Sequence, residues 1–83
     1  MVKIHLYGIR LTPPQHELVE KFLKPHTYLE SVSIHKLSNN QIQLFTYEFE
    51  EGHYQDLRNF ESREEFLGYC RGVISARDNP NAL

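Results

Sequence analysis

The sequence predicts an α+β domain of order β-α-β-β-β-α, in which a four-stranded, mostly antiparallel sheet carries two helices on one face. Three short segments place apolar residues at every second position, which is the period of a strand, and a fourth, mostly polar segment reads as an edge strand. Two further segments repeat apolar residues at helical spacing and begin with a capping box. Because the chain has only 83 residues, we expect one domain over residues 1–77 and a flexible tail over 78–83.

The first strand and the first helix follow from local signals near the N-terminus. Apolar residues alternate with other residues over 2–7, and Gly8 ends this strand. The segment 12–15 reads Thr-Pro-Pro-Gln, which supplies an N-cap, a proline at the first helical position and a glutamine that completes a capping box. We therefore expect a helix that begins at Pro13 and stops at Pro25.

The central hairpin is the strongest signal, because it specifies its own register. The predicted strands 30–37 and 41–49 are joined by residues whose Asn-Asn pair, at 39–40, suits the positive φ angles of a two-residue turn. Such a turn pairs Ser38 with Gln41 and puts most apolar residues of both strands on one face. That face, which we expect to form the core, consists of Val32, Ile34, Phe45, Tyr47 and Phe49, joined by Leu57 of the fourth strand.

The remaining elements follow the hairpin. A three-residue loop at 50–52 leads to a polar edge strand at 53–59. A second capping box at 62–65 opens a closing helix. A right-handed crossover through the first helix sets the first strand parallel to the second. The sequence leaves open whether the first strand lies beside the second or the fourth, and we favour the second. The cross-strand pairs that this arrangement predicts are Tyr47 with Gln55 and Phe45 with Leu57.

The outer face of the hairpin carries the first candidate binding surface. The two-residue turn pairs Leu37 with Ile42, and His35 with Leu44, on the side away from the helices. Three clustered aliphatic side chains that face solvent on a small domain indicate a partner surface. The alternative is that strand one or the tail covers these residues, or that they are scattered exposed aliphatics of no special role.

The second candidate surface is the outer side of the closing helix. Gly68 and Gly72 lie opposite the apolar stripe, together with Ser75 and Ala76, where a solvated helix usually carries charges. Each glycine costs about 1 kcal/mol relative to alanine within a helix, so the pair invites a close contact with another element. In the alternative, Gly72 ends the helix as its C′ residue.

Sites for chemistry have little support, and we expect no catalytic residue, cofactor or metal. The five histidines form no close ligand pair, and only His5 and His35 could meet if the first two strands are neighbours. Cys70 falls on the apolar stripe of the closing helix, with no base beside it. The adjacent carboxylates at 50–51 and 64–65 have structural roles at a turn and a helix start. A small enzyme or a metal-binding protein is therefore a minor alternative.

Charge and composition narrow the class of partner. The net charge of −2 comes from 9 basic and 11 acidic residues spread along the chain, which gives no basic surface for nucleic acid or anionic lipid. The single cysteine excludes an internal disulfide and fits a cytoplasmic protein. No segment approaches the ~20 apolar residues of a membrane span.

Nucleic-acid binding is a further alternative, because the aromatic run 45–49 could form a stacking platform. The order αβββα also resembles that of double-stranded-RNA-binding domains. The helix that would meet phosphates, however, opens with two glutamates at 64–65, and the aromatic face is the one expected in the core. We therefore predict a non-catalytic protein-binding domain that acts as a regulatory, inhibitor or accessory protein. Its partner is another protein or a second copy of itself in a homodimer.

Overall fold

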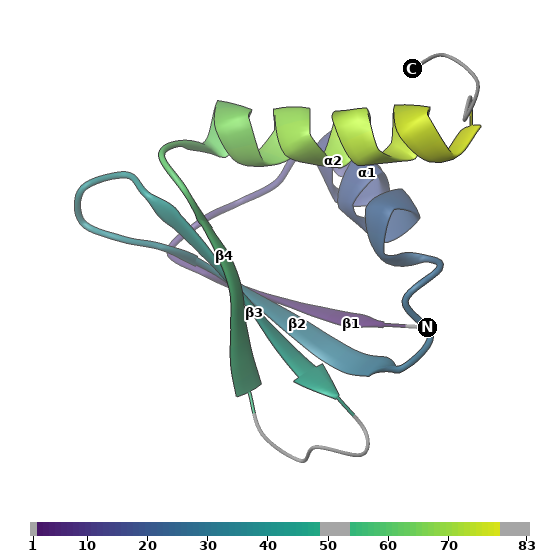
Figure 1. Cartoon of the computed structure of the whole chain (residues 1–83). Coiled ribbons are helices and arrows are strands. Elements are labelled where there is room, and N and C mark those ends of the chain that lie inside the picture. The colour runs from purple at the N-terminus through teal and green to yellow at the C-terminus, as the bar shows by residue number, and fades with distance from the viewer. Residues whose placement is uncertain (1, 49–53, 79–83) are drawn as a thin grey trace.

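The computed structural model describes residues 2–48 and 54–78, and the side chains of 2–48 and 58–78. It confirms the predicted α+β class and element order. Both helices lie on one face of the sheet (Figure 1). The elements in chain order are β1 (Lys3–Tyr7), α1 (Pro13–Leu23), β2 (Leu29–Lys36), β3 (Ile42–Glu48), β4 (Tyr54–Phe60) and α2 (Arg63–Asp78).

The four-stranded sheet is mixed rather than mostly antiparallel. Its order is β1-β2-β3-β4, and β1 runs parallel to β2 while the other neighbours are antiparallel. The predicted position of β1 beside β2 is confirmed. The parallel pair is possible because α1 carries the chain back to the starting end of the sheet before β2 begins.

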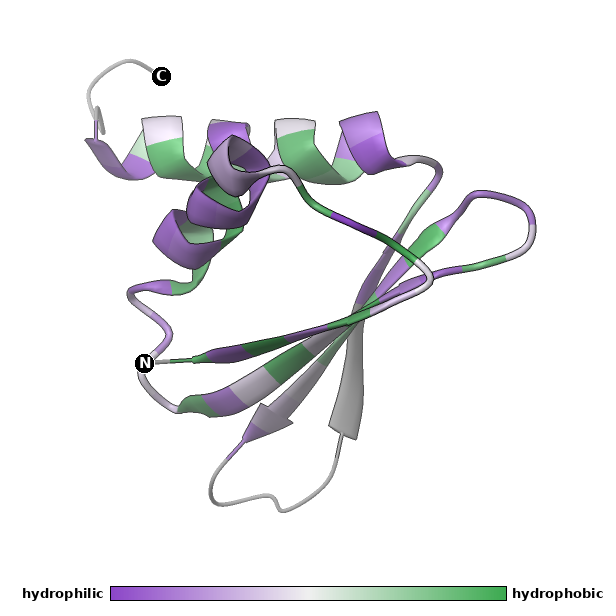
Figure 2. Cartoon of the chain, turned by 180° about the vertical axis from the view of Figure 1, so that it is seen from behind, coloured by the Kyte–Doolittle hydropathy of each residue, from purple (hydrophilic) through white to green (hydrophobic). Residues whose placement is uncertain are grey.

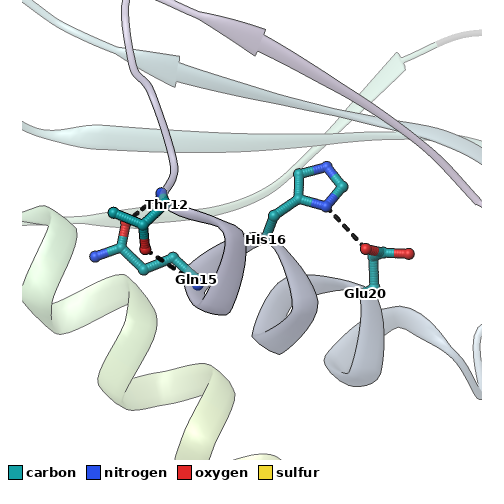
Figure 3. A network of polar contacts seen from close by, with 4 residues as sticks. All are labelled: Thr12, Gln15, His16 and Glu20. Atoms are coloured by element: carbon teal, nitrogen blue, oxygen red, sulfur yellow. Dashed lines mark hydrogen bonds and ion pairs between the residues drawn. The ribbon is translucent and has the colours of Figure 1, made fainter.

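Helix α1 begins as the sequence predicts. The Thr12 hydroxyl accepts the Gln15 N–H at 3.4 Å, and the Gln15 side chain accepts the Thr12 N–H at 3.0 Å (Figure 3). This reciprocal capping box satisfies two N–H groups that the first turn leaves without helical partners. The helix then buries Val19, Phe22 and Leu23 against the core.

Helix α2 begins with a related but different cap. The Ser62 hydroxyl accepts the Glu65 N–H at 3.2 Å, as in a capping box. The Glu65 carboxylate, however, accepts the N–H of Glu61 at 3.3 Å rather than that of Ser62. The acidic side chains in the first turn also complement the positive end of the helix dipole.

Helix α2 extends beyond Gly72, the residue at which one of the two sequence-based alternatives ended it. It continues without a break past Gly72 to residue 78, so the alternative in which Gly72 ends the helix is wrong. Phe66, Leu67, Cys70 and Ile74 form its buried stripe. Residues 79–83, the rest of the predicted tail, lie outside the described part of the chain.

The hairpin between β2 and β3 closes with three residues rather than two. Leu37 N–H donates to Gln41 O at 2.8 Å, and Asn40 N–H donates to Leu37 O at 3.0 Å. Asn40 has a φ of 68°, the left-handed conformation that completes a three-residue loop. The Asn39 side chain accepts the Gln41 N–H at 3.1 Å. The predicted two-residue turn is therefore wrong.

The longer loop shifts the pairing of β2 with β3 by one residue. Ile34 pairs with Leu44, and Ser33 pairs with Phe45. Because successive side chains of a strand point to opposite sides, this shift exchanges the two faces of β3. Phe45 and Tyr47 lie on the face away from the helices, so their predicted place in the core is wrong. The residues of β3 that are buried instead are Ile42, Leu44 and Thr46.

The pairing of β3 with β4 also departs from the prediction. Leu44 lies opposite Arg58, but Phe45 lies opposite Asp56, so the register shifts by one residue between these pairs. Such an irregularity bends a strand and interrupts its ladder of hydrogen bonds. The predicted pairs that it replaces are Phe45 with Leu57 and Tyr47 with Gln55.

The core lies between the sheet and the two helices. Hydrophobic residues recur along both helices and alternate along β1 and β2 (Figure 2). Val32 and Ile34 occupy the core as predicted, and each is 0% exposed. The predicted loop at 50–52, Phe49 and the Leu57 side chain lie outside the described positions.

Candidate functional site

The structure removes two residues from the predicted hairpin patch. Ile42 and Leu44 are 1% and 0% exposed, because the observed register places them beneath the helices. Their predicted place on the outer face is therefore wrong, and the cluster of exposed aliphatic residues does not form. Leu37 is half-buried next to the hairpin loop. His35 does lie on the outer face of the sheet, as predicted.

The glycine pair of α2 is exposed, as predicted. A Cβ built at Gly68 or Gly72 has no heavy atom within 4 Å beyond its chain neighbours and its own helix backbone. No other described part of the chain therefore packs closely against this side of α2. The role of the pair as a contact surface stays a prediction.

The face of the sheet away from the helices carries an ordered array of side chains. The strand registers align three rows across it: Lys3-Ser31-Tyr47, His5-Ser33-Phe45 and Tyr7-His35-Gln43. We call these nine residues the outer sheet face. Both helices lie on the opposite side (Figure 1). Ser31 and Ser33 are 6% and 4% exposed, because larger side chains stand on both sides of each serine.

The His35 ring contacts two other rings of the outer sheet face, those of Tyr7 and Phe45. The Tyr7 and His35 rings stack with centroids 4.6 Å apart and planes 15° apart. The Phe45 ring meets the His35 ring nearly at right angles, with centroids 5.1 Å apart. Tyr7 nevertheless remains 50% exposed. Since Tyr7 and His35 each use one ring face against the other, the trio is a preformed cluster rather than a set of free ring faces.

Charge is sparse on the outer sheet face. With neutral histidines, Lys3 carries the single formal charge among the nine residues, and none of them is a carboxylic acid. A surface with few charges and several aromatic rings has the composition of the central part of a protein–protein interface. A surface that binds nucleic acid would instead need several lysines or arginines to contact phosphates.

A second side-chain cluster joins the C-terminal ends of the two helices, beside a cavity of about 230 Å³. Arg77 lies 3.3 Å from His26 Nε2 and donates to Lys21 O at 3.4 Å. Because a guanidinium only donates, the His26 proton lies on Nδ1, which donates to Tyr28 Oη at 3.1 Å. Burial and the Arg77 charge lower the pKa of His26, which favours this neutral form. These bonds tie α2 to α1 and to the segment that follows it, so we assign the cluster a structural role.

Preformed sites for chemistry are not found among the described residues. No three histidine, cysteine or carboxylate side chains in this part of the chain are placed to hold a metal ion. Cys70 is 0% exposed, and burial raises the pKa of its thiol to about 11, so the nucleophilic thiolate is scarce near neutral pH. His35 packs its ring on Tyr7 and Phe45, and His5 lies in a different row.

No protein family, curated protein or solved structure gives a significant match to the chain. The surfaces of the domain must therefore carry any argument about function. Among the helices that the structure describes, none is both long and apolar enough to cross a bilayer.

The sequence analysis did not name Tyr7 as a candidate binding residue, and it placed Phe45 in the core. Tyr7 could have been found, because it shares the outward side of its strand with Lys3 and His5. Phe45 could not, because its orientation depends on the hairpin register.

Proposed function

We propose that this chain is a small non-catalytic protein-binding domain whose contact surface is the outer sheet face. The observation that supports it is the contact between the Tyr7, His35 and Phe45 rings on a face that neither helix covers. Rings that already pack on one another lose little further freedom when a partner covers them. A regulatory, inhibitor or accessory role fits such a domain. We also propose a cytoplasmic location, since the chain has one cysteine and so no internal disulfide.

We propose a second copy of the chain as the first partner to test. The nine residues of the outer sheet face include one lysine and no carboxylate, so these three rows add little charge repulsion between two copies. Sheets can pack face to face about 10 Å apart, with their side chains interdigitated. A domain of 83 residues has a small core, and a partner that covers an apolar surface of the folded state adds to its stability by mass action.

Two exposed tyrosines provide a matched test of the contact surface. Tyr7 is 50% exposed on the outer sheet face, and Tyr28 is 54% exposed beside the helix ends. Tyr7→Arg should weaken self-association, because it introduces a charge that the interface leaves unpaired. Tyr28→Arg should leave self-association unchanged. Sedimentation velocity over a concentration series measures both effects, and far-UV circular dichroism verifies that both variants fold.

The same two variants decide between a second copy and a different protein. If wild type and Tyr7→Arg self-associate equally, the outer sheet face is not the dimer contact. If wild type is monomeric at every concentration, affinity purification from the native host with wild type, Tyr7→Arg and Tyr28→Arg is the next test. Proteins captured by wild type and Tyr28→Arg but lost with Tyr7→Arg would support a heteromeric complex on this face.

Nucleic-acid binding is the second candidate, favoured by the outward position of Phe45 where the sequence predicted a core residue. Two observations count against it. Bases need free ring faces, but Tyr7 and His35 stack on each other, and Lys3 is the single cation of the face. Fluorescence anisotropy with labelled single-stranded RNA and DNA at about 50 mM and about 200 mM salt tests it. Binding that weakens steeply with salt would overturn the protein-binding proposal.

A further inference from the structure

We propose that the groove between β1 and α1 binds an extended peptide of a partner protein, which adds to the sheet as a fifth strand. The peptide pairs with the free edge of β1, inserts an apolar side chain between β1 and α1, and places a carboxylate near Lys24. This inference rests on the proposed protein-binding function but uses a surface other than the outer sheet face.

The first observation is the open edge of β1. Among the described strands, β1 pairs only with β2. Every second residue of such a strand directs its N–H and C=O away from the sheet, where a new strand can bind them. The pairing of β1 with β2 is continuous over Lys3–Tyr7, whereas β4, at the other edge, pairs irregularly with its neighbour. A regular edge is the better template for strand addition.

The second observation is a cavity of about 600 Å³ beside this edge. Ligand sites typically have volumes of about 300–1,000 Å³. The start of β1 lies next to the chain that leaves α1 (Figure 1). Residues from both segments line the cavity. Val2 and Ile4 stay only half-buried although they point to the helix side. The apolar lining residues are Val2, Ile4, Leu23 and Leu29.

The third observation concerns the charged residues at the cavity. Glu20 accepts a hydrogen bond from His16 Nδ1 at 2.8 Å on the same helix (Figure 3). The Lys21 ammonium lies 3.9 Å from the Asp78 carboxylate. Lys24, by contrast, forms no ion pair with any residue that the structure describes. An acidic side chain or a C-terminal carboxylate of the peptide therefore has an unpaired cation to meet.

The open edge favours a peptide over a small amphiphile. A long-chain fatty acid would also place an apolar chain in the cavity and a carboxylate near Lys24. It would leave the backbone groups along β1 unpaired, whereas an extended peptide pairs them as it fills the cavity. The test therefore has to detect backbone pairing as well as occupation of the cavity.

A displayed library of random linear peptides, selected against the wild-type protein, supplies the probe. We expect the selected peptides to share an apolar and an acidic residue at fixed spacing. N-methylation of every second peptide residue should abolish binding in one register and leave it intact in the other, because only alternate N–H groups face β1. Calorimetry measures the affinities. Equal loss or equal tolerance in the two registers would overturn strand addition.

Two lysine variants locate the peptide on the protein. Lys24→Glu should lower the affinity of an acidic selected peptide by about tenfold or more, since attraction becomes repulsion. Lys36→Glu makes the same charge change at an exposed lysine, at the end of β2 opposite to the cavity-lining Leu29, and should leave the affinity unchanged. Equal effects of the two variants would place the peptide elsewhere.

The groove and the outer sheet face can be separated experimentally. Gln43→Arg, on the outer sheet face but on β3 and away from the free edge of β1, should reduce self-association without changing the peptide affinity, and Lys24→Glu should do the opposite, so either proposal can fail alone. If the library yields no peptide, and a long-chain fatty acid binds wild type more tightly than Lys24→Glu, the cavity belongs to an amphiphile. That result would overturn the peptide groove.

Discussion

Replacing Leu44 by alanine should cost far more stability than replacing its neighbour Phe45. Leu44 is 0% exposed beneath the helices, so its truncation removes buried methyl groups and leaves a cavity, at a cost of about 2–5 kcal/mol. Phe45 is half-buried on the open face. Its truncation loses the contact with the His35 ring and part of the buried ring area, about 1–2 kcal/mol. The smaller side chain therefore has the larger effect.

The measurement is urea unfolding followed by far-UV circular dichroism, since the chain has no tryptophan. At about 0.05–0.15 kcal/mol per residue, 83 residues give a free energy of unfolding of about 4–12 kcal/mol. Leu44→Ala thus removes a large fraction of the total, whereas Phe45→Ala leaves most of it. Equal denaturant slopes would show that both variants expose the same surface on unfolding.

A milder pair keeps the test decisive if Leu44→Ala does not fold. Ile42→Val should cost about 0.5–1.5 kcal/mol, and Gln43→Ala, on the open face, should be close to neutral. A larger cost at Phe45 than at Leu44 would refute the observed register. The aromatic residues of β3 would then face the helices, and the outer sheet face on which the proposed function rests would not exist.

Four further predictions test local features. Asn40→Val should lower the free energy of unfolding in urea by about 1–2 kcal/mol, because valine disfavours a φ of 68°. Asn40→Gly should not lower it, and equal costs of the two variants would contradict the left-handed conformation of Asn40. Gly68→Ala and Gly72→Ala should each raise the free energy of unfolding by about 0.8–1 kcal/mol, because alanine favours the helix and its methyl meets no other part of the fold. A lower free energy of unfolding would instead reveal a close contact at that position. Cys70, whose thiol pKa burial raises to about 11, should react with a thiol reagent only after denaturation, and rapid labelling of the native protein would contradict its burial. Because the pKa of His26 is lower in the folded than in the unfolded chain, the unfolded state takes up its proton first as the pH falls below about 6.5. The free energy of unfolding should therefore decrease as the pH is lowered from about 6.5 to the pKa of His26 in the folded protein. If His26→Gln and wild type show the same dependence on pH, this prediction is wrong.

Local signals in the sequence were sufficient to predict where both helices begin, but not whether α2 continues past Gly72. The start of α1 depends on Thr12, Pro13 and Gln15, which interact within a single turn. The parallel direction of β1 and β2 follows from one further rule, the right-handed crossover through a helix, whereas the choice of β2 over β4 as the neighbour of β1 was left open by the sequence. These predictions succeeded because they involve few residues that are close together in the sequence.

The hairpin register could not be predicted, because both candidate registers satisfy the local rules. Asn40 takes a positive φ in either loop, and only the two-residue turn requires the same of Asn39. Each face of β3 also offers two large apolar residues, so polarity does not choose between them. Tertiary packing decides between the two registers of β3. The ring of Phe60 on β4 already contacts the ring of Phe66 on α2, and the compact side chains of Ile42 and Leu44 fill the core beside these rings.

The candidate sites were predictable only in part. His35 lies on the outer face in both registers of β3, because its orientation depends on β2 alone. The groove had no signal in the sequence, because it depends on how α1 lies over the start of β1. A surface between two elements that are distant in the sequence is a property of their packing, and local patterns do not specify it.

Both proposed contacts meet at β1. Because successive side chains of a strand point to opposite sides, Val2 and Ile4 line the groove while Tyr7 belongs to the outer sheet face. A partner strand added along β1 would alternate in the same way, with one set of side chains over the cavity and the other beside Tyr7. At the far edge, Arg58 of β4 lies over the Tyr69 ring of α2 with its guanidinium 4.6 Å from the centroid, which ties that side of the sheet to the helix layer. Of the two edges of the sheet, β1 is the one with regular pairing to its neighbour, and a single partner bound there could engage both surfaces.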